Sequence, residues 1–222
     1  MAVAGKHRLS RKAIKQPDEF ITFTNRALLW AREHQQLVTW AGAGVAAILV
    51  VLGIAGAYRG ARDRDANADL GRAMSKLDGK DYAGASTALT EVAGRWEGTG
   101  VAPIAALLGA NAALDGGDAD KAITQLSSLQ GQSATLPSYL QQQLLLAWGA
   151  ALESKQQWLD AAGKYKEAAA VSGPYTVEAI LGEARTRDLG GQGDSARALY
   201  KQAYEQFPDV PDREVIAAKA QL

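Results

Sequence analysis

The apolar and polar positions of the chain follow two patterns, and the change between them falls near residue 59. The stretch LVTWAGAGVAAILVVLGIAGAY, residues 37–58, has 22 residues and no charged side chain, and nine of them are Leu, Ile or Val. A helix of this length spans about 33 Å, which matches a bilayer hydrocarbon core of about 30 Å. The pattern therefore predicts a transmembrane helix over residues 37–58.

Two other interpretations of the apolar stretch stay open. A buried core helix is typically shorter and is seldom uncharged on every side. A cleaved signal peptide is favoured by the small residues Ala55-Gly56-Ala57. It is disfavoured by the 36 residues that precede the stretch and by an apolar length beyond the usual limit of about 15 residues. We prefer a retained anchor.

The charged residues beside the stretch bear on its orientation. Residues 1–36 hold seven Lys or Arg and three acidic residues, while Arg59, Arg62 and Arg64 follow the stretch. Large domains are translocated regardless of a few flanking charges. We therefore expect the short basic tail to stay in the cytoplasm and the acidic C-terminal part to cross the membrane.

An amphipathic helix is predicted before the span, in PDEFITFTNRALLWAREHQQ, with its start at Pro17-Asp18. Its aromatic residues fall on one face at helical spacing, as is typical of a helix that lies in the membrane interface. A surface for a cytoplasmic partner is the alternative. The expected membrane-interface residues are Phe20, Phe23, Trp30, Trp40 and Tyr58.

Small residues recur at four-residue spacing within the span, including Gly42 with Ala46 and Gly53 with Ala57. Such pairs let two helix backbones approach closely. We expect them to pack against a partner span, which allows a homo-oligomer. Chance occurrence in a segment rich in Ala and Gly is the alternative.

After residue 66, Ala, Leu, Gln, Glu and Lys recur at helical spacing without the alternation of strands. Four similar units each begin at a turn: DYAGASTALTEVA, DADKAITQLSSLQ, QWLDAAGKYKEAA and QGDSARALYKQAYEQFP. Their offsets of 37, 39 and 35 residues are close to the period of about 34 in tetratricopeptide repeats. The aligned positions are Ala85, Ala122, Ala161 and Ala196, then Leu89, Leu126, Tyr165 and Tyr200, then Val92, Leu129, Ala168 and Ala203.

The residue types at these positions predict pairs of antiparallel helices. A small residue lets the two helices of a pair cross closely, and a Tyr or Leu one turn later fills the space between pairs. Gly149 and Ala184 precede Ala161 and Ala196 by 12 residues, where the first helix of a pair needs a small side chain, and Pro208 marks the end of the last pair. We expect an all-α fold, in which the transmembrane helix is followed by a tetratricopeptide-like α-solenoid of four helix hairpins with residues 211–222 as a cap. The expected domains are a basic cytoplasmic tail (1–36), the transmembrane helix (37–58), a juxtamembrane linker (59–65) and the helical-repeat domain (66–222).

Composition limits the chemistry of the repeat domain. The chain has no Cys, and both His7 and His34 precede the span, so residues 66–222 contain no Cys or His nucleophile, base or zinc ligand. Their 14 basic and 19 acidic residues disfavour a nucleic-acid partner. Glu153 and Glu183 are carboxylates of the kind a glycosidase uses, but nothing distinguishes them from surface acids. The sequence predicts no enzyme activity, cofactor or metal site.

Function is therefore expected on the concave face, which the first helix of each pair lines in such solenoids. Two leucines offer apolar contact there, unless they pack within the solenoid, and one arginine is positioned to clamp an acidic group. The expected protein-binding residues are Asn111, Gln143, Leu146, Glu153, Leu181 and Arg185.

The C-terminal sequence LGEARTRDLGGQGDSARALYKQAYEQFPDVPDREVIAAKAQL carries a family resemblance. Gly182-Glu183-Ala184, the Gly-Asp turn before Ala196-Arg197 and the closing Lys219-x-x-Leu222 resemble the ancillary SecYEG translocon subunit family of YfgM type. Members of that family have a single inner-membrane span and a periplasmic tetratricopeptide domain, and the order of parts here is similar along essentially the whole chain. The tail here is longer, since it includes PDEFITFTNRALLWAREHQ.

The resemblance implies a location and partners. It implies a single-pass protein of the bacterial inner membrane, with a cytoplasmic N-terminus and a periplasmic C-terminal domain. The implied function is that of an interaction scaffold or chaperone helper at the Sec export channel, with translocon subunits, periplasmic chaperones or translocating polypeptides as partners. A regulatory or assembly subunit of another bacterial envelope complex is the alternative.

Overall fold

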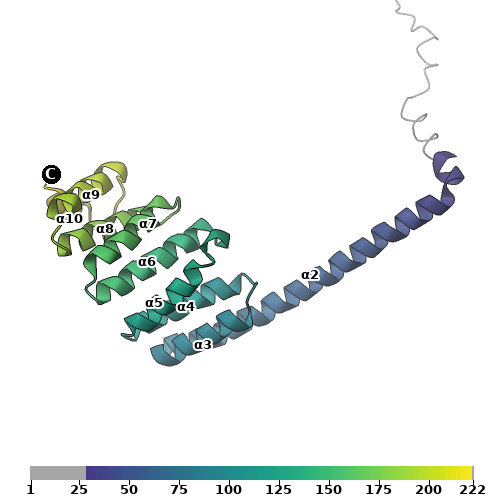
Figure 1. Ribbon diagram of the computed structural model, residues 1–222, viewed down its shortest axis with the longest axis horizontal. Coiled ribbons are helices and arrows are strands. Elements are labelled where there is room, and N and C mark those ends of the chain that lie inside the picture. The colour runs from purple at the N-terminus through teal and green to yellow at the C-terminus, as the bar shows by residue number, and fades with distance from the viewer. Residues whose placement is uncertain (1–28, 222) are drawn as a thin grey trace, which may run out of the picture. The chain divides into compact units, whose positions relative to one another are not determined.

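The computed structural model describes residues 29–221, and every regular element in that range is helical (Figure 1). This confirms the all-α class for the described residues. The α-helices are α2 (Gln35–Asp78), α3 (Tyr82–Arg95), α4 (Val101–Asp115), α5 (Ala119–Gln130), α6 (Ser138–Ser154), α7 (Trp158–Ala170), α8 (Thr176–Leu189), α9 (Gly193–Gln206) and α10 (Arg213–Ala220), and a short 3-10 helix, η1 (Ser133–Thr135), precedes α6.

The chain divides into two compact units after Tyr58. In the described part of the first unit, α2 carries the apolar stretch, with a mean hydropathy of 2.3 and no buried residue in its most apolar window. By length and composition it is a candidate membrane span. Gly42 and Gly53 have no neighbour within 4 Å of an added Cβ, so their small faces are open.

The expected interface residues are only partly described. Trp30, Trp40 and Tyr58 are exposed, and the Trp30 ring stacks on His34 with centroids 4.8 Å apart. Phe20 and Phe23 lie outside the described residues, as does the predicted start of the amphipathic helix. Their role in a membrane interface stays a prediction.

The second unit, residues 59–222, is a tetratricopeptide-like solenoid. The C-terminal part of α2 pairs with α3, and the pairs α4 with α5, α6 with α7 and α8 with α9 follow in chain order (Figure 1). Residues 59–65, expected as a linker, are helical as part of α2. Helix α10 packs Ile216 and Ala220 against Tyr200 of α9, so the last segment covers the final pair.

The twelve aligned repeat positions are all buried. The four alanines that open the alignment are at most 1% exposed, and the Leu or Tyr four residues later is at most 5% exposed. The Tyr165 ring of the third pair lies against Gly149 of α6 in the same pair and against Gly182 of α8 in the next pair. A Cβ added at Gly149 would lie 2.7 Å from the ring, which explains why this crossing needs glycine.

One turn geometry repeats at the same position in all four pairs. In each turn the fifth residue before the aligned alanine has a positive φ: Lys80 (57°), Gly117 (82°), Gln156 (60°) and Gly191 (81°). The next residue bonds back to the end of the first helix, as the Asp118 N–H does to the Ala113 carbonyl at 2.8 Å. This left-handed helix ending makes Gly190-Gly191-Gln192 the turn between α8 and α9.

Candidate protein-interaction face

The six residues expected on the concave face lie on the first helices of three successive pairs. Helices α4, α6 and α8 contact one another in this order. Five of the six side chains are half-buried and Arg185 is exposed: Asn111 lies on α4, Gln143, Leu146 and Glu153 on α6, and Leu181 and Arg185 on α8.

The two leucines contribute to packing inside the solenoid. Leu146 packs against the buried cluster that contains Tyr165, and Leu181 packs against the cluster that contains Tyr200. Because both side chains remain half-buried, each keeps an exposed apolar edge. Packing within the solenoid therefore buries part of each leucine side chain. Contact between the exposed part and a partner stays a prediction.

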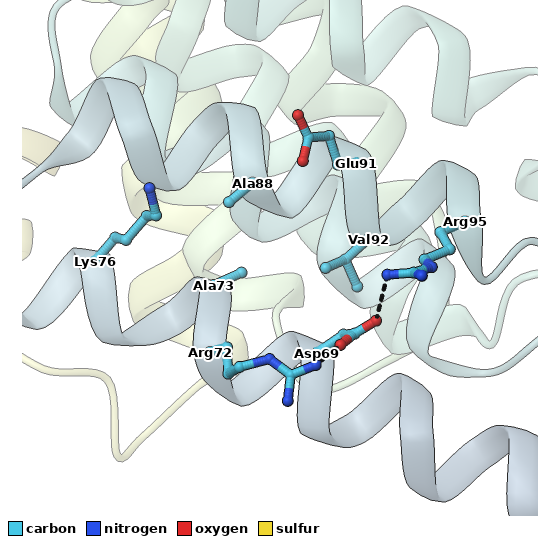
Figure 2. A pocket seen from close by; sticks show the side chains of 8 residues that line it. All are labelled: Asp69, Arg72, Ala73, Lys76, Ala88, Glu91, Val92 and Arg95. Carbon is cyan, nitrogen blue, oxygen red and sulfur yellow. Dashed lines mark hydrogen bonds and ion pairs between the residues drawn. The ribbon is translucent and has the colours of Figure 1, made fainter.

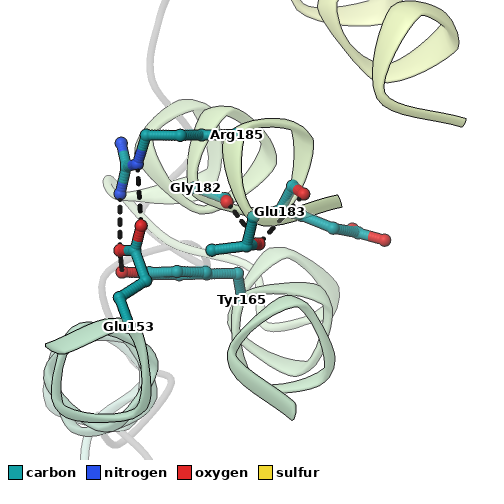
Figure 3. A network of polar contacts seen from close by, with 6 residues as sticks. Glu153, Tyr165, Gly182, Glu183 and Arg185 are labelled. Atoms are coloured by element: carbon teal, nitrogen blue, oxygen red, sulfur yellow. Dashed lines mark hydrogen bonds and ion pairs between the residues drawn. The ribbon is translucent and has the colours of Figure 1, made fainter. Parts of the chain in front are cut away.

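Glu153 and Arg185 form an ion pair between α6 and α8 (Figure 3). The guanidinium donates two hydrogen bonds to the carboxylate, from Nε to Oε1 at 2.9 Å and from Nη2 to Oε2 at 2.7 Å. The Tyr165 hydroxyl of α7 donates a third to Oε2 at 2.6 Å. In this structure the acid that Arg185 clamps is therefore Glu153 of the same chain.

Each group in this network has a shifted pKa. Burial favours the neutral form of Glu153, but the hydrogen bonds from Arg185 and Tyr165 outweigh it and hold the pKa of Glu153 below its ordinary value. Burial, followed by the hydrogen bond to Glu153, raises the pKa of Tyr165, and the hydrogen bond to Glu153 raises the pKa of Arg185. The network is thus fixed as one anion, one cation and a neutral phenol at neutral pH.

The two amides expected on this face differ in their contacts. Gln143 donates from Nε2 to the Tyr175 hydroxyl at 2.6 Å, so its orientation is set by the start of α8. The Asn111 side chain makes no hydrogen bond to another described residue and stays half-buried on α4. A side-chain amide can both donate to and accept from a peptide group, so Asn111 offers a paired contact to a polypeptide backbone.

Gln142 is the important residue that sequence reasoning missed. Its side chain is fully buried. Its Nε2 donates to the Val171 carbonyl at 2.8 Å, and its Oε1 accepts from the Tyr175 N–H at 3.0 Å. It thereby satisfies backbone groups in the connection between α7 and α8, and an added Cβ at Gly173 would lie 2.3 Å from its Oε1. Residues 141–143 are all glutamine, so the sequence does not indicate which of them is buried.

Both carboxylates considered for an enzyme are held in ion pairs. Glu153 bonds to Arg185, and the buried Glu183 bonds to Arg187 one turn along α8, at 2.7 Å. Among the described residues no group of three His, Cys, Asp or Glu side chains is arranged to hold a metal ion. What the face offers is apolar contact, amide hydrogen bonding and a fixed charge pair.

Comparison with known proteins bears on the fold. Neither protein-family models nor curated proteins gave a match. The similar solved structures include the nearly identical TPR-like repeats of a kinesin light chain candidate from Podosopora anserina, and a single-substitution variant of the same repeats. Sequence identities are 16% and 15%, and in both cases the TM-score is 0.56, with 69% of this chain and 82% of the other covered.

These likenesses, with the helix pairs described above, define the chain as a TPR-like helical-repeat protein with a candidate span near its N-terminus. Folds of this kind are typical of scaffolds for protein interaction.

Proposed function

We propose that this protein is a membrane-anchored, non-catalytic interaction scaffold or chaperone helper that holds partner polypeptides near the Sec export channel. This proposal is supported mainly by the combination of a candidate span with a helical solenoid. The first helices of that solenoid present half-buried leucines and the Asn111 amide, which has no hydrogen-bond partner among the described residues. The translocon assignment rests on the family resemblance of residues 181–222 and on the order of the chain's parts.

The proposed arrangement is that of a single-pass inner-membrane protein. The basic tail lies in the cytoplasm, residues 37–58 span the bilayer and the repeat domain lies in the periplasm. Protease treatment of spheroplasts, with intact-mass measurement of the extracted protein, tests this arrangement. A protein that starts near Tyr58, or a repeat domain protected in spheroplasts, contradicts it.

The proposed binding face is tested by site-specific photo-crosslinking in intact cells. A photo-reactive residue at Asn111 or Gln143 is expected to capture export-channel subunits, chaperones or translocating chains. The matched control is Lys166, an exposed residue on the second helix α7. Equal capture from Lys166, or no capture of export components from α4 and α6, rules out this face as the export contact.

A second candidate is a regulatory or assembly subunit of another envelope complex. It is favoured by the aromatic segment before the span, whose exposed Trp30 stacks on His34. Deletion of residues 6–32 separates the two candidates. The translocon scaffold keeps its periplasmic crosslinks after this deletion, whereas a subunit that signals across the membrane loses its function.

A further inference from the structure

The first helix pair has an open groove. Helices α2 and α3 line a space of about 390 Å³ whose apolar residues are Ala73, Ala88 and Val92 (Figure 2). In the later pairs, the first helix is packed against the second helix of the preceding pair, as α4 is against α3 and α6 is against α5. No preceding second helix exists for α2 among residues 29–221.

The residues of this groove differ in kind from those inside the stack. Three charged positions of the first helix α2 align with three apolar positions of the equivalent helix α6 in the third pair. Asp69, Arg72 and Lys76 of α2 correspond to Leu145, Trp148 and Leu152 of α6. An apolar helix is therefore a poor match for this groove, and a covering helix needs complementary charge.

Asp69 holds two of the groove's cations. It accepts a hydrogen bond from the Trp96 indole at 2.8 Å and forms ion pairs with Arg72 and, at 3.4 Å, with Arg95. These contacts hold the pKa of Asp69 below its ordinary value, with the Trp96 hydrogen bond as the largest cause. Asp69 thus contacts both guanidiniums within the first pair, and its single negative charge offsets one of their two positive charges.

Two further charges of the groove lie one on each wall. Lys76 on α2 and Glu91 on α3 are exposed, and neither forms an ion pair with another described residue (Figure 2). A cation on one wall and an anion on the other make the groove complementary to itself.

We propose that a second copy of this chain covers the groove, related to the first by a two-fold axis that runs along it. Helix α2 of each copy then faces α3 of the other in antiparallel orientation, which repeats the contact that α3 makes with α4 inside the stack. Lys76 of each copy faces Glu91 of the other, so the symmetry makes this ion pair twice. Because the contact is polar, it is reversible and sensitive to salt.

A second copy fits these charges better than an unrelated partner. A strongly acidic helix would bring like charge against Glu91, and a strongly basic helix would bring like charge against Lys76 and the two arginines. A second copy related by the two-fold axis places an opposite charge against both Lys76 and Glu91. Only α2 and α3 form this contact, so it is independent of the partners proposed for the concave face.

Disulfide crosslinking tests the geometry directly, because the natural chain has no Cys. Full-length Lys76→Cys and Glu91→Cys chains with different tags are co-expressed and oxidised in membranes. The mixed disulfide is expected in clear excess over that of a control pair, Lys166→Cys with Glu214→Cys, two exposed positions on α7 and α10. A yield no higher than the control overturns the proposal.

Charge reversal tests the ion pair. In detergent-solubilised full-length protein, Lys76→Glu or Glu91→Lys is expected to weaken self-association by about tenfold, and the double reversal is expected to restore it. Lys166→Glu is the matched control for surface charge, and circular dichroism checks that helix content is kept. Single reversals without effect, a double reversal without recovery, or association unchanged by high salt each overturn the proposal.

Discussion

Arg185 of α8 holds Glu153 of α6 through two parallel hydrogen bonds, and this ion pair joins the first helices of two successive repeats. Tyr165, from the helix between them in the chain, donates to the same carboxylate. Three helices therefore meet at one carboxylate. A two-bond guanidinium contact fixes orientation more strictly than a single bond does, so this pair helps to hold α8 in place against α6.

Replacing this carboxylate is expected to destabilise the domain. Glu153→Gln keeps the size of the side chain but removes its charge, and we expect a loss of about 1 kcal/mol in the free energy of unfolding at pH 7, because the pair is partly exposed to solvent. Urea unfolding followed by circular dichroism measures it. Arg197→Gln, which breaks the exposed pair with Asp194, is the control and should change the free energy of unfolding by much less.

The same pair predicts a pH dependence. The pKa of Glu153 in the folded protein lies below its ordinary value of 4.5, so its charge stabilises the fold fully above that value. This stabilisation is lost as the pH falls through the folded-state pKa. The stability difference between the natural protein and Glu153→Gln should therefore shrink below about pH 4. A difference that stays constant from pH 7 to pH 3 would contradict the assignment.

Glycine at the crossing of α6 with Tyr165 is expected to be essential. In Gly149→Ala the new Cβ would lie 2.7 Å from a ring that is only 4% exposed, so the helices must shift, and we expect a loss of about 2 kcal/mol despite the better helix propensity of alanine. Gly163→Ala on α7 is the control, since nothing lies within 4 Å of its added Cβ. It should stabilise the domain by up to about 1 kcal/mol.

A rescue experiment distinguishes this clash from a general effect on α6. The third pair has Gly149 and Tyr165 at this crossing. At the equivalent positions the first two pairs have alanine and leucine, such as Ala73 and Leu89 in the first pair. The double variant Gly149→Ala with Tyr165→Leu is therefore expected to lose less stability than the sum of the two single variants. Additive losses would show that the ring and the glycine are not coupled.

The repeat positions illustrate what sequence alone could predict. Spacing identified Ala161, Tyr165 and Gly149 as packing residues because a repeat needs the same residue size at the same place in each unit. The partners of polar side chains were not predictable in this way. Glu153 and Arg185 were expected to face a partner, and their contact with each other depends on the distance between α6 and α8, which residue spacing does not encode.

The turns between paired helices predict a stabilising substitution. Gln156 has φ 60° at a position where the second and fourth turns have glycine. A side chain in this conformation costs about 1 kcal/mol or more, and glycine avoids most of that cost but has more freedom to lose on folding. We expect Gln156→Gly to raise the free energy of unfolding by about 0.5 kcal/mol in urea unfolding.

The matched control for this turn is Gln157→Gly, one residue later, where φ is −85° and glycine offers no relief. That variant should lose stability, because it adds only unfolded-state freedom. If both glycine variants behave alike, the positive φ at Gln156 carries no strain.

The candidate span is tested by a charge at its centre. Val50 lies in the apolar part of α2, where its side chain is 60% exposed in the structure. In a bilayer, Val50→Arg would cost about 3 kcal/mol of insertion free energy, which is comparable to the few kcal/mol that nine Leu, Ile and Val residues provide. We expect the variant to appear largely in the soluble fraction after alkaline carbonate extraction, while the natural protein stays in the membrane pellet. Val50→Leu is the control and should remain in the pellet. A natural protein that carbonate extracts as readily as Val50→Arg does would mean that α2 is not held in a bilayer, and the anchored scaffold would have to be abandoned in favour of a free one.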